Sequence, residues 1–153
     1  MTMPNHHERV ARTTVLVSEV RMVCVESAAD RGGEVPVSLT YDQTDPYAVA
    51  LVFHTSEGDI TWMVARELLV VGATSPAGDG DVMVWPALTP ELEDAVVIRL
   101  QAPGGRLVLR VGRLELDDFL RRTLALVPAG SESDNLDLDA LVEIGRASCR
   151  ERV

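Results

Sequence analysis

One stretch, residues 41–55 with the sequence YDQTDPYAVALVFHT, combines residue types that can carry out chemistry. It holds two carboxylates, Asp42 and Asp45, and a histidine, His54, which are side chains used for general acid–base catalysis. Asp45 precedes Pro46, which has no N–H and forces the chain to turn. Aspartates beside a turn usually accept hydrogen bonds from their own backbone. We therefore expect Asp42 and Asp45 to shape a turn rather than to transfer protons.

The sequence shows no other arrangement that is typical of an active site. There is no Gly-x-Ser-x-Gly motif, and the serines, histidines and aspartates have no spacing that would join them in a catalytic triad. The segment Gly78-Asp79-Gly80-Asp81 lacks the loop length and the distal glutamate of a calcium loop. It does not join a strand to a helix, as a phosphate-binding loop does. We expect no catalytic residue, no metal and no cofactor, and therefore no enzyme.

Four side chains each allow a structural and a functional interpretation. Trp62 and Trp85 lie in alternating strand patterns, which favours a core or interface role over a platform for stacking bases. His54 ends a strand, and a hydrogen-bonded structural histidine is favoured over a pH-sensitive one. Arg66 lies at a strand-to-helix break, where it either pairs with a nearby carboxylate or contacts a partner. None of the four identifies a reaction.

The composition favours a single domain with one core. The chain has 153 residues, of which 46% are apolar, and this is hardly enough for two domains. No apolar run approaches the ~20 residues of a membrane span, and the N-terminus lacks an apolar signal segment, so we expect a cytoplasmic protein. The net charge is −10, and all 14 basic residues are arginine. This charge argues against a general nucleic-acid-binding protein.

Apolar residues at every second position predict seven strands. They cover residues 13–25, 35–41, 48–54, 60–64, 81–85, 95–101 and 106–111, and Pro86 is expected to end the fifth. Residues 66–71 predict a short helical turn or a strand extension, closed by Gly72. From about Leu114 the period changes to that of an amphipathic helix, which Pro128 and Gly130 end. The predicted fold class is α+β, with the helix packed on a curved antiparallel sheet.

We divide the chain into three segments. Residues 1–12 predict a flexible arm, residues 13–142 the domain, and residues 143–153 a tail that does not belong to it. The last ten residues, IGRASCRERV, carry three arginines after an acidic run, and they equal the translation of a common sequencing adapter. We therefore interpret the tail as non-native read-through and leave it out of the fold. A longer genomic sequence that encodes these residues before a stop codon would contradict this.

Four sequence blocks resemble the SsgA-like proteins of sporulating actinobacteria. They are YDQTDPYAVALVFHT (residues 41–55), WMVARELL (62–69), GDGDVMVWP (78–86) and FLRRT (119–123), in the order and spacing of that family. We expect the matching residues to be mainly structural. They are Tyr41, Asp42, Asp45, Pro46, Tyr47, Phe53, His54, Trp62, Arg66, Gly80, Trp85 and Pro86. The sequence departs from the family pattern at Met83, where Arg is frequent, and at Glu67, where Asp is frequent, which favours a divergent member.

The resemblance implies a non-catalytic regulator of sporulation-specific cell division. Such a protein acts through protein–protein interaction in septum-site selection, division-protein recruitment or septal peptidoglycan remodelling. The implied partners are the division protein FtsZ or other SsgA-like proteins, and the implied location is the cytoplasm, with recruitment to the cell septum. The implied fold is a Whirly-like twisted sheet, and the implied assembly is a homo-oligomer such as a trimer. Candidate partner contacts are Arg66, Arg121 and Arg122.

Whirly proteins bind single-stranded nucleic acid, which supplies an alternative function. That function requires a cluster of arginines on one face of the sheet. The candidates are Arg99, Arg106, Arg110 and Arg113. The acidic net charge weighs against this alternative, so no nucleic acid is expected as a partner.

Overall fold

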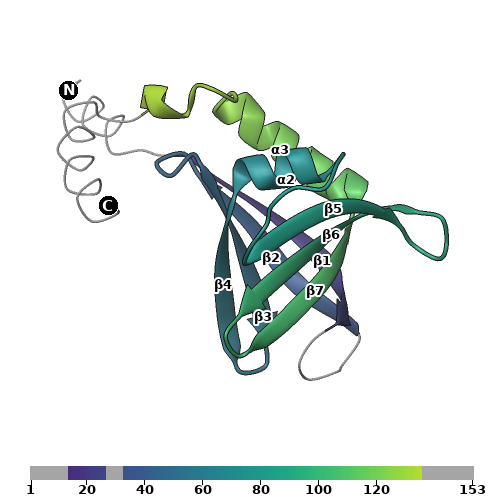
Figure 1. Ribbon diagram of the computed structural model, residues 1–153. Coiled ribbons are helices and arrows are strands. Elements are labelled where there is room, and N and C mark those ends of the chain that lie inside the picture. Colours follow the sequence, from purple (N-terminus) through teal and green to yellow (C-terminus); the bar gives the residue numbers. More distant parts are fainter. Residues whose placement is uncertain (1–13, 27–32, 136–153) are drawn as a thin grey trace.

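The structure is a computed structural model, and it describes residues 14–26 and 33–135 (Figure 1). The strands are β1 (Val15–Glu26), β2 (Gly33–Asp42), β3 (Ala48–Thr55), β4 (Gly58–Ala65), β5 (Val82–Leu88), β6 (Asp94–Ala102) and β7 (Gly105–Gly112). The helices are α2 (Arg66–Gly72), α3 (Arg113–Leu126) and the 3-10 helix η1 (Glu132–Asn135). The expected arm at residues 1–12, the tail at 143–153 and the domain end near Val142 lie outside the described residues.

All seven strands form one sheet in the order β4-β3-β2-β1-β7-β6-β5. Every ladder between neighbours is antiparallel, and the β1–β7 ladder contains a register shift between Cys24 and Glu26. The sheet curls, and α2 and α3 lie over one end of it (Figure 1). The predicted α+β fold with a seven-stranded antiparallel sheet is therefore confirmed.

The core lies on the concave side of the sheet, because alternate strand residues point there. The chain buries Leu39 and Tyr41 of β2 and Leu51 of β3 on this side, together with Leu116 and Phe119 of α3. Complete burial of one such side chain stabilises the fold by about 1.5–3 kcal/mol. The helix expected from about Leu114 corresponds to α3, which places its buried residues on this core.

The expectation that Pro86 ends the fifth strand is wrong, because β5 continues to Leu88. Pro86 pairs in register with Val96 of β6, and β5 is an edge strand. Val84, two residues earlier, exchanges both backbone hydrogen bonds with Ala77 on the side away from β6. The missing N–H of Pro86 therefore faces the edge, where proline is tolerated in a sheet.

Residues 66–71 lie in a helix, α2, and do not extend the preceding strand. The helix ends at Gly72, which packs directly against β5: a Cβ at this position would lie 2.3 Å from Cγ1 of Val84. Only glycine allows this approach, so Gly72 holds α2 close to the sheet. No helix within residues 14–26 and 33–135 is both long and apolar enough to cross a membrane.

Candidate partner-binding groove

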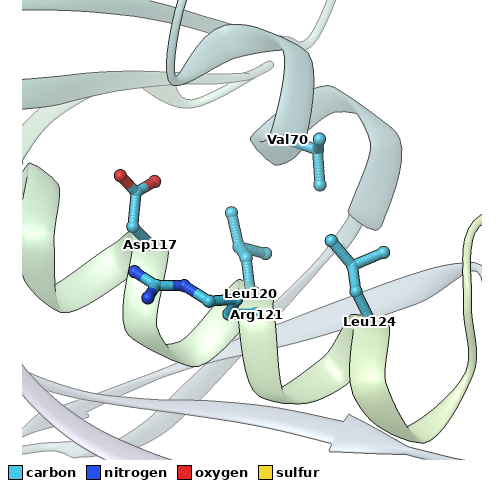
Figure 2. A pocket seen from close by; sticks show the side chains of 5 residues that line it. All are labelled: Val70, Asp117, Leu120, Arg121 and Leu124. Carbon is cyan, nitrogen blue, oxygen red and sulfur yellow. The ribbon is translucent and has the colours of Figure 1, made fainter.

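A shallow hollow runs between α2 and α3 (Figure 2). Val70 points from α2 toward α3, while Leu120 and Leu124 of α3 line the opposite wall. Asp117 and Arg121 add one negative and one positive charge. The hollow has a volume of about 200 Å³. It therefore combines an apolar floor with charged side chains, a composition common at protein interfaces.

The hollow continues toward the turn between β2 and β3. A second hollow of about 490 Å³ shares Val70 and Leu124 with the first and reaches Tyr47, Arg66 and Glu132. We call the two together the α2–α3 groove. Tyr47 is 54% exposed at its rim, although it is a large aromatic residue. Exposed aromatic residues beside an apolar hollow are frequent in binding sites.

Arg66 is one of the residues that line the groove, and it is only 2% exposed. Its Nη1 donates a hydrogen bond to the carbonyl of Thr123 in α3 at 3.0 Å, and its Nη2 donates to Oε2 of Glu132 at 2.9 Å. Its guanidinium also lies 5.1 Å from the ring centroid of Tyr41. The sequence left open whether Arg66 pairs with a carboxylate or contacts a partner. In the structure it pairs with Glu132 and joins α2, α3, β2 and η1.

Two ionisable groups around Arg66 have shifted pKa values. Burial raises the pKa of the Tyr41 phenol, and the positive charge of Arg66 opposes this shift. Hydrogen bonds from its own backbone N–H and from Arg66 lower the pKa of the Glu132 carboxyl. The Tyr41 hydroxyl donates to the carbonyl of Pro46 at 2.8 Å. At neutral pH Arg66 therefore contacts a neutral phenol, which is buried and does not line the groove, and an ionised carboxylate.

The turn at residues 42–47 positions Tyr47 beside the groove. Oδ1 of Asp42 accepts hydrogen bonds from the backbone N–H of Thr44 at 2.9 Å and from its hydroxyl at 2.7 Å. Asp42 thus shapes this turn, whereas Asp45 is exposed next to the buried Pro46. The backbone N–H of Arg66 donates to the carbonyl of Tyr47 at 2.8 Å. The most distinctive sequence block therefore supports one end of the groove.

The two remaining candidate contacts lie on the exposed side of α3. Arg121 lines the groove and is exposed. Arg122 is exposed one residue further, with its guanidinium 5.8 Å from the ring centroid of Phe119 and its Nε 3.7 Å from Asp118. Both present charge to the solvent, in contrast to Arg66.

On the convex face of the sheet, the structure brings together four polar residues that the sequence did not connect. The hydroxyl of Ser38 lies 2.8 and 2.9 Å from the two oxygens of Glu19 and 2.6 Å from Nε2 of His54. Nδ1 of His54 lies 3.0 Å from Oδ1 of Asp59. These residues come from β1, β2, β3 and β4. The pairs Glu19–Ser38 and His54–Asp59 are opposite each other in register, which no sequence spacing reveals.

Ser38, His54 and Asp59 follow the order of a catalytic triad, but Glu19 changes what this arrangement can do. Ser38 is 7% exposed, and its single proton is shared between a carboxylate and an imidazole. The hydroxyl is bonded on both sides, so the group is a polar link across four strands.

The other residues of the four blocks are distributed over both faces. Phe53 is buried in the core, and Trp62 is half-buried on the same concave side. Trp85 is half-buried on the convex side, because its neighbour Val84 points into the core. The two tryptophans therefore form no common platform. Gly80 is exposed in open space, and nothing in the structure explains a glycine there.

The family described as Streptomyces sporulation and cell division protein, SsgA, matches residues 35–132. This range contains α2, α3 and every residue of the α2–α3 groove. The chain belongs to the SsgA family. The resemblance noted in the four sequence blocks is thereby confirmed.

Named relatives match this SsgA-family protein over more than two thirds of its chain. The sporulation-specific cell division protein SsgB of Salinispora tropica is 43% identical over 136 residues, covering 85% of this chain and 91% of the relative. SsgB of Streptomyces coelicolor is 44% identical over 106 residues, covering 69% of this chain and 77% of the relative.

Solved structures agree with the fold. A Streptomyces coelicolor structure, from work in which mutations in SsgB correlate to longitudinal cell division during sporulation, superposes with a TM-score of 0.74 at 38% identity. The superposition covers 81% of this chain and 97% of the Streptomyces coelicolor chain. The SsgA-like sporulation-specific cell division protein of Thermobifida fusca gives a TM-score of 0.75 at 35% identity, covering 87% and 96%.

Proposed function

We propose that this SsgA-family protein is a non-catalytic regulator of sporulation-specific cell division. It acts through protein–protein interaction in septum-site selection, division-protein recruitment or septal peptidoglycan remodelling. The observation that carries the proposal is the family match over residues 35–132, with relatives named for sporulation-specific cell division. The partners are FtsZ or other SsgA-like proteins, and the protein works in the cytoplasm, recruited to the septum.

The α2–α3 groove is the surface we assign to partner contact. Its floor is apolar, its rim carries the exposed Tyr47, and Arg121 supplies a solvent-facing charge. Tyrosine and arginine are enriched among the few residues that contribute most of the binding energy of protein interfaces. Arg66 and Glu132 hold the two helices and η1 in position beneath it. Arg121 and Arg122 contact the partner directly, and Arg66 supports the surface from below.

The experiment is a deletion in the source organism, followed by complementation. Loss of the protein should disturb septum number or position during sporulation, and a wild-type copy should restore it. A copy with Arg121→Glu and Arg122→Glu should restore less, because the charge at the contact surface is reversed. The matched control is a copy with Glu91→Arg and Glu93→Arg, which reverses two exposed charges in the turn between β5 and β6. Normal septa in the deletion strain, without a compensating relative, would contradict the proposal.

The convex face of the sheet supports assembly into a homo-oligomer such as a trimer, and we propose the Whirly-like arrangement for the sheet. Val15, Val17 and Val25 of β1 and Met63 of β4 are exposed there. Apolar side chains that share a solvent-facing sheet surface favour association. Light scattering on the purified full chain should give a mass that is a multiple of the monomer. A Val17→Glu variant should lower that mass.

A single-stranded nucleic-acid binder is the second candidate function. The register of β6 and β7 places Arg99, Arg106 and Arg110 on the same convex face as Trp85. Arg113 lies elsewhere, because it donates to the carbonyl of Ala73 and pairs with Asp117. A salt-sensitive mobility shift of labelled single strands would favour this candidate. We expect no shift at low salt, in keeping with the net charge of −10.

A further inference from the structure

The two edge strands of the sheet, β4 and β5, differ in how far their outer backbone groups are hydrogen-bonded. On the free side of β5, Ala77 donates to the carbonyl of Val84 at 2.8 Å, and Val84 donates back at 3.0 Å. Pro86, the next residue on that side, has no N–H to offer. Natural proteins cover or interrupt sheet edges in this way, because exposed backbone groups invite pairing with another chain. The β5 edge is thus protected.

The β4 edge has no such protection within the described part of the chain. The N–H of Arg66 donates to Tyr47 and continues the β3–β4 ladder, so Ile60, Trp62 and Val64 direct their backbone groups toward β3. The backbone groups of the alternate residues, Thr61 and Met63, therefore point away from the sheet. The strand GDITWMVA contains no proline, lysine or arginine. Ile60 and Met63 are also 53% and 54% exposed, so the edge is apolar as well as open.

An apolar cup lies next to this edge on the concave side, at the end of the sheet away from the helices. It has a volume of about 610 Å³ and is lined by Ile60 and Trp62 of β4, Phe53 of β3, and Leu107 and Leu109 of β7. A strand that pairs with β4 directs every second side chain to the side on which Ile60 and Trp62 lie. Those side chains would enter the cup, so the open edge and the cup form one continuous site.

The charges around β4 select the kind of strand. Glu57 precedes it and Glu67 follows it, while its second residue, Asp59, is paired with His54. The one base in this stretch, Arg66, is buried. In an antiparallel pair of two β4 strands, Glu57 of one copy would lie near Glu67 of the other, and the like charges would repel. A second copy of this chain is therefore disfavoured here. An extended segment with basic ends is favoured.

We propose that β4 binds an extended segment of a partner protein by strand addition, with apolar side chains at alternate positions in the cup and basic residues at both ends. Main-chain hydrogen bonds supply affinity in this mode, and the pockets for alternate side chains supply specificity. The inference rests on the proposed function, since it names a recognition mode for a protein that acts through partners. The site is distinct from the α2–α3 groove, which lies at the other end of the molecule (Figure 1).

The first test uses synthetic peptides with the full-length chain. The parent peptide has eight residues, the length of β4, alternates valine or leucine with threonine, and carries arginine at each end. Two derivatives carry N-methyl groups on alternate amides, one derivative for each edge of the peptide. Because only one peptide edge faces β4, one derivative should lose binding at least about ten-fold and the other should retain it. Equal binding of both derivatives would overturn the proposal.

The second test changes β4 itself. Met63→Pro removes an N–H that faces the open edge, and proline is accepted at such positions. Met63→Ala removes the side chain and keeps the N–H, which makes it the matched control. Met63→Pro should weaken peptide binding about ten-fold, and Met63→Ala less than about three-fold. If Met63→Pro fails to fold, slowed hydrogen exchange of the Thr61 and Met63 amides in the wild-type complex decides the same point.

Further outcomes separate this inference from the proposed function. A peptide with glutamate at both ends should bind at least about ten-fold more weakly than the parent. Loss of the oligomer in Met63→Pro, without peptide binding to the wild type, would show that the edge joins copies of the chain and would overturn the proposal. If the deletion strain has abnormal septa and Met63→Pro restores them as well as Met63→Ala does, this inference falls while the proposed function stands.

Discussion

At the scale of the residue, the ionised carboxylate of Glu132 contributes to the acid stability of the groove, because its own backbone N–H and Arg66 both bind it. Glu132 has a lowered pKa in the folded protein, so its ionised form favours folding. This contribution is present above the unfolded-state pKa of about 4.3 and is lost as the pH falls through the folded value. Glu132→Gln should therefore lower the free energy of unfolding near neutral pH. The difference from the wild type should shrink on acidification.

Urea unfolding at a series of pH values measures this effect. The matched control is Glu91→Gln, which neutralises an exposed glutamate between β5 and β6. It should leave the free energy of unfolding within about 0.5 kcal/mol of the wild type. A Glu132→Gln protein as stable as the control near neutral pH would show that Arg66 does not need this carboxylate.

The polar link of Ser38, His54, Glu19 and Asp59 supports a second residue-scale prediction. Ser38→Ala removes the central hydroxyl and leaves Nε2 of His54 without its partner at 2.6 Å. We expect a loss of about 1–2 kcal/mol in the free energy of unfolding, against little change in Ser56→Ala at an exposed turn. A fluorophosphonate reagent, which labels activated serines, should leave Ser38 unmodified. Labelling that depends on His54 would instead indicate a catalytic serine.

At the scale of the element, α3 holds the core and the groove together. Phe119 is fully buried against the sheet, while Leu114 on the same helix is 79% exposed. Phe119→Ala should cost about 3–5 kcal/mol, because it leaves a cavity that the sheet cannot fill. Leu114→Ala should change stability by less than about 0.5 kcal/mol. Thermal unfolding of the two variants measures the contrast, and equal losses would contradict the packing described here.

The same elements show which features of the fold can be predicted from the sequence and which cannot. In residues 48–54 and 106–111, apolar residues alternate with other residues. This pattern predicts strands, because each strand buries one of its faces in the core. Pro86 was misjudged because its tolerance depends on β5 being an edge strand, which is a property of the sheet order and not of the local sequence. The Ser38–His54 contact and the groove were missed for a related reason. Register and helix packing bring together residues that no spacing connects.

At the scale of the whole molecule, one core cluster joins the meander β1–β4 to the meander β5–β7. It includes Leu51 and Val64 from the first meander and Val84 and Ile98 from the second. We therefore expect both meanders to unfold in one cooperative transition. The variants Trp85→Phe and Trp62→Phe leave one tryptophan each, in β4 and β5 respectively. For each variant, the urea unfolding curve followed by tryptophan fluorescence should coincide with the curve followed by circular dichroism. Two separate transitions in one variant would show that the two meanders do not unfold together.

The position of β1 in the middle of the sheet has a consequence for synthesis on the ribosome. β1 pairs on one side with β2, the next strand along the chain, and on the other side with β7, the last strand among the described residues. Until β7 has left the exit tunnel, one edge of β1 in the nascent chain lacks its pairing strand. The apolar concave surface is covered only later, when α3 has been translated as well. The sheet and its core therefore remain incomplete until most of the chain has been translated.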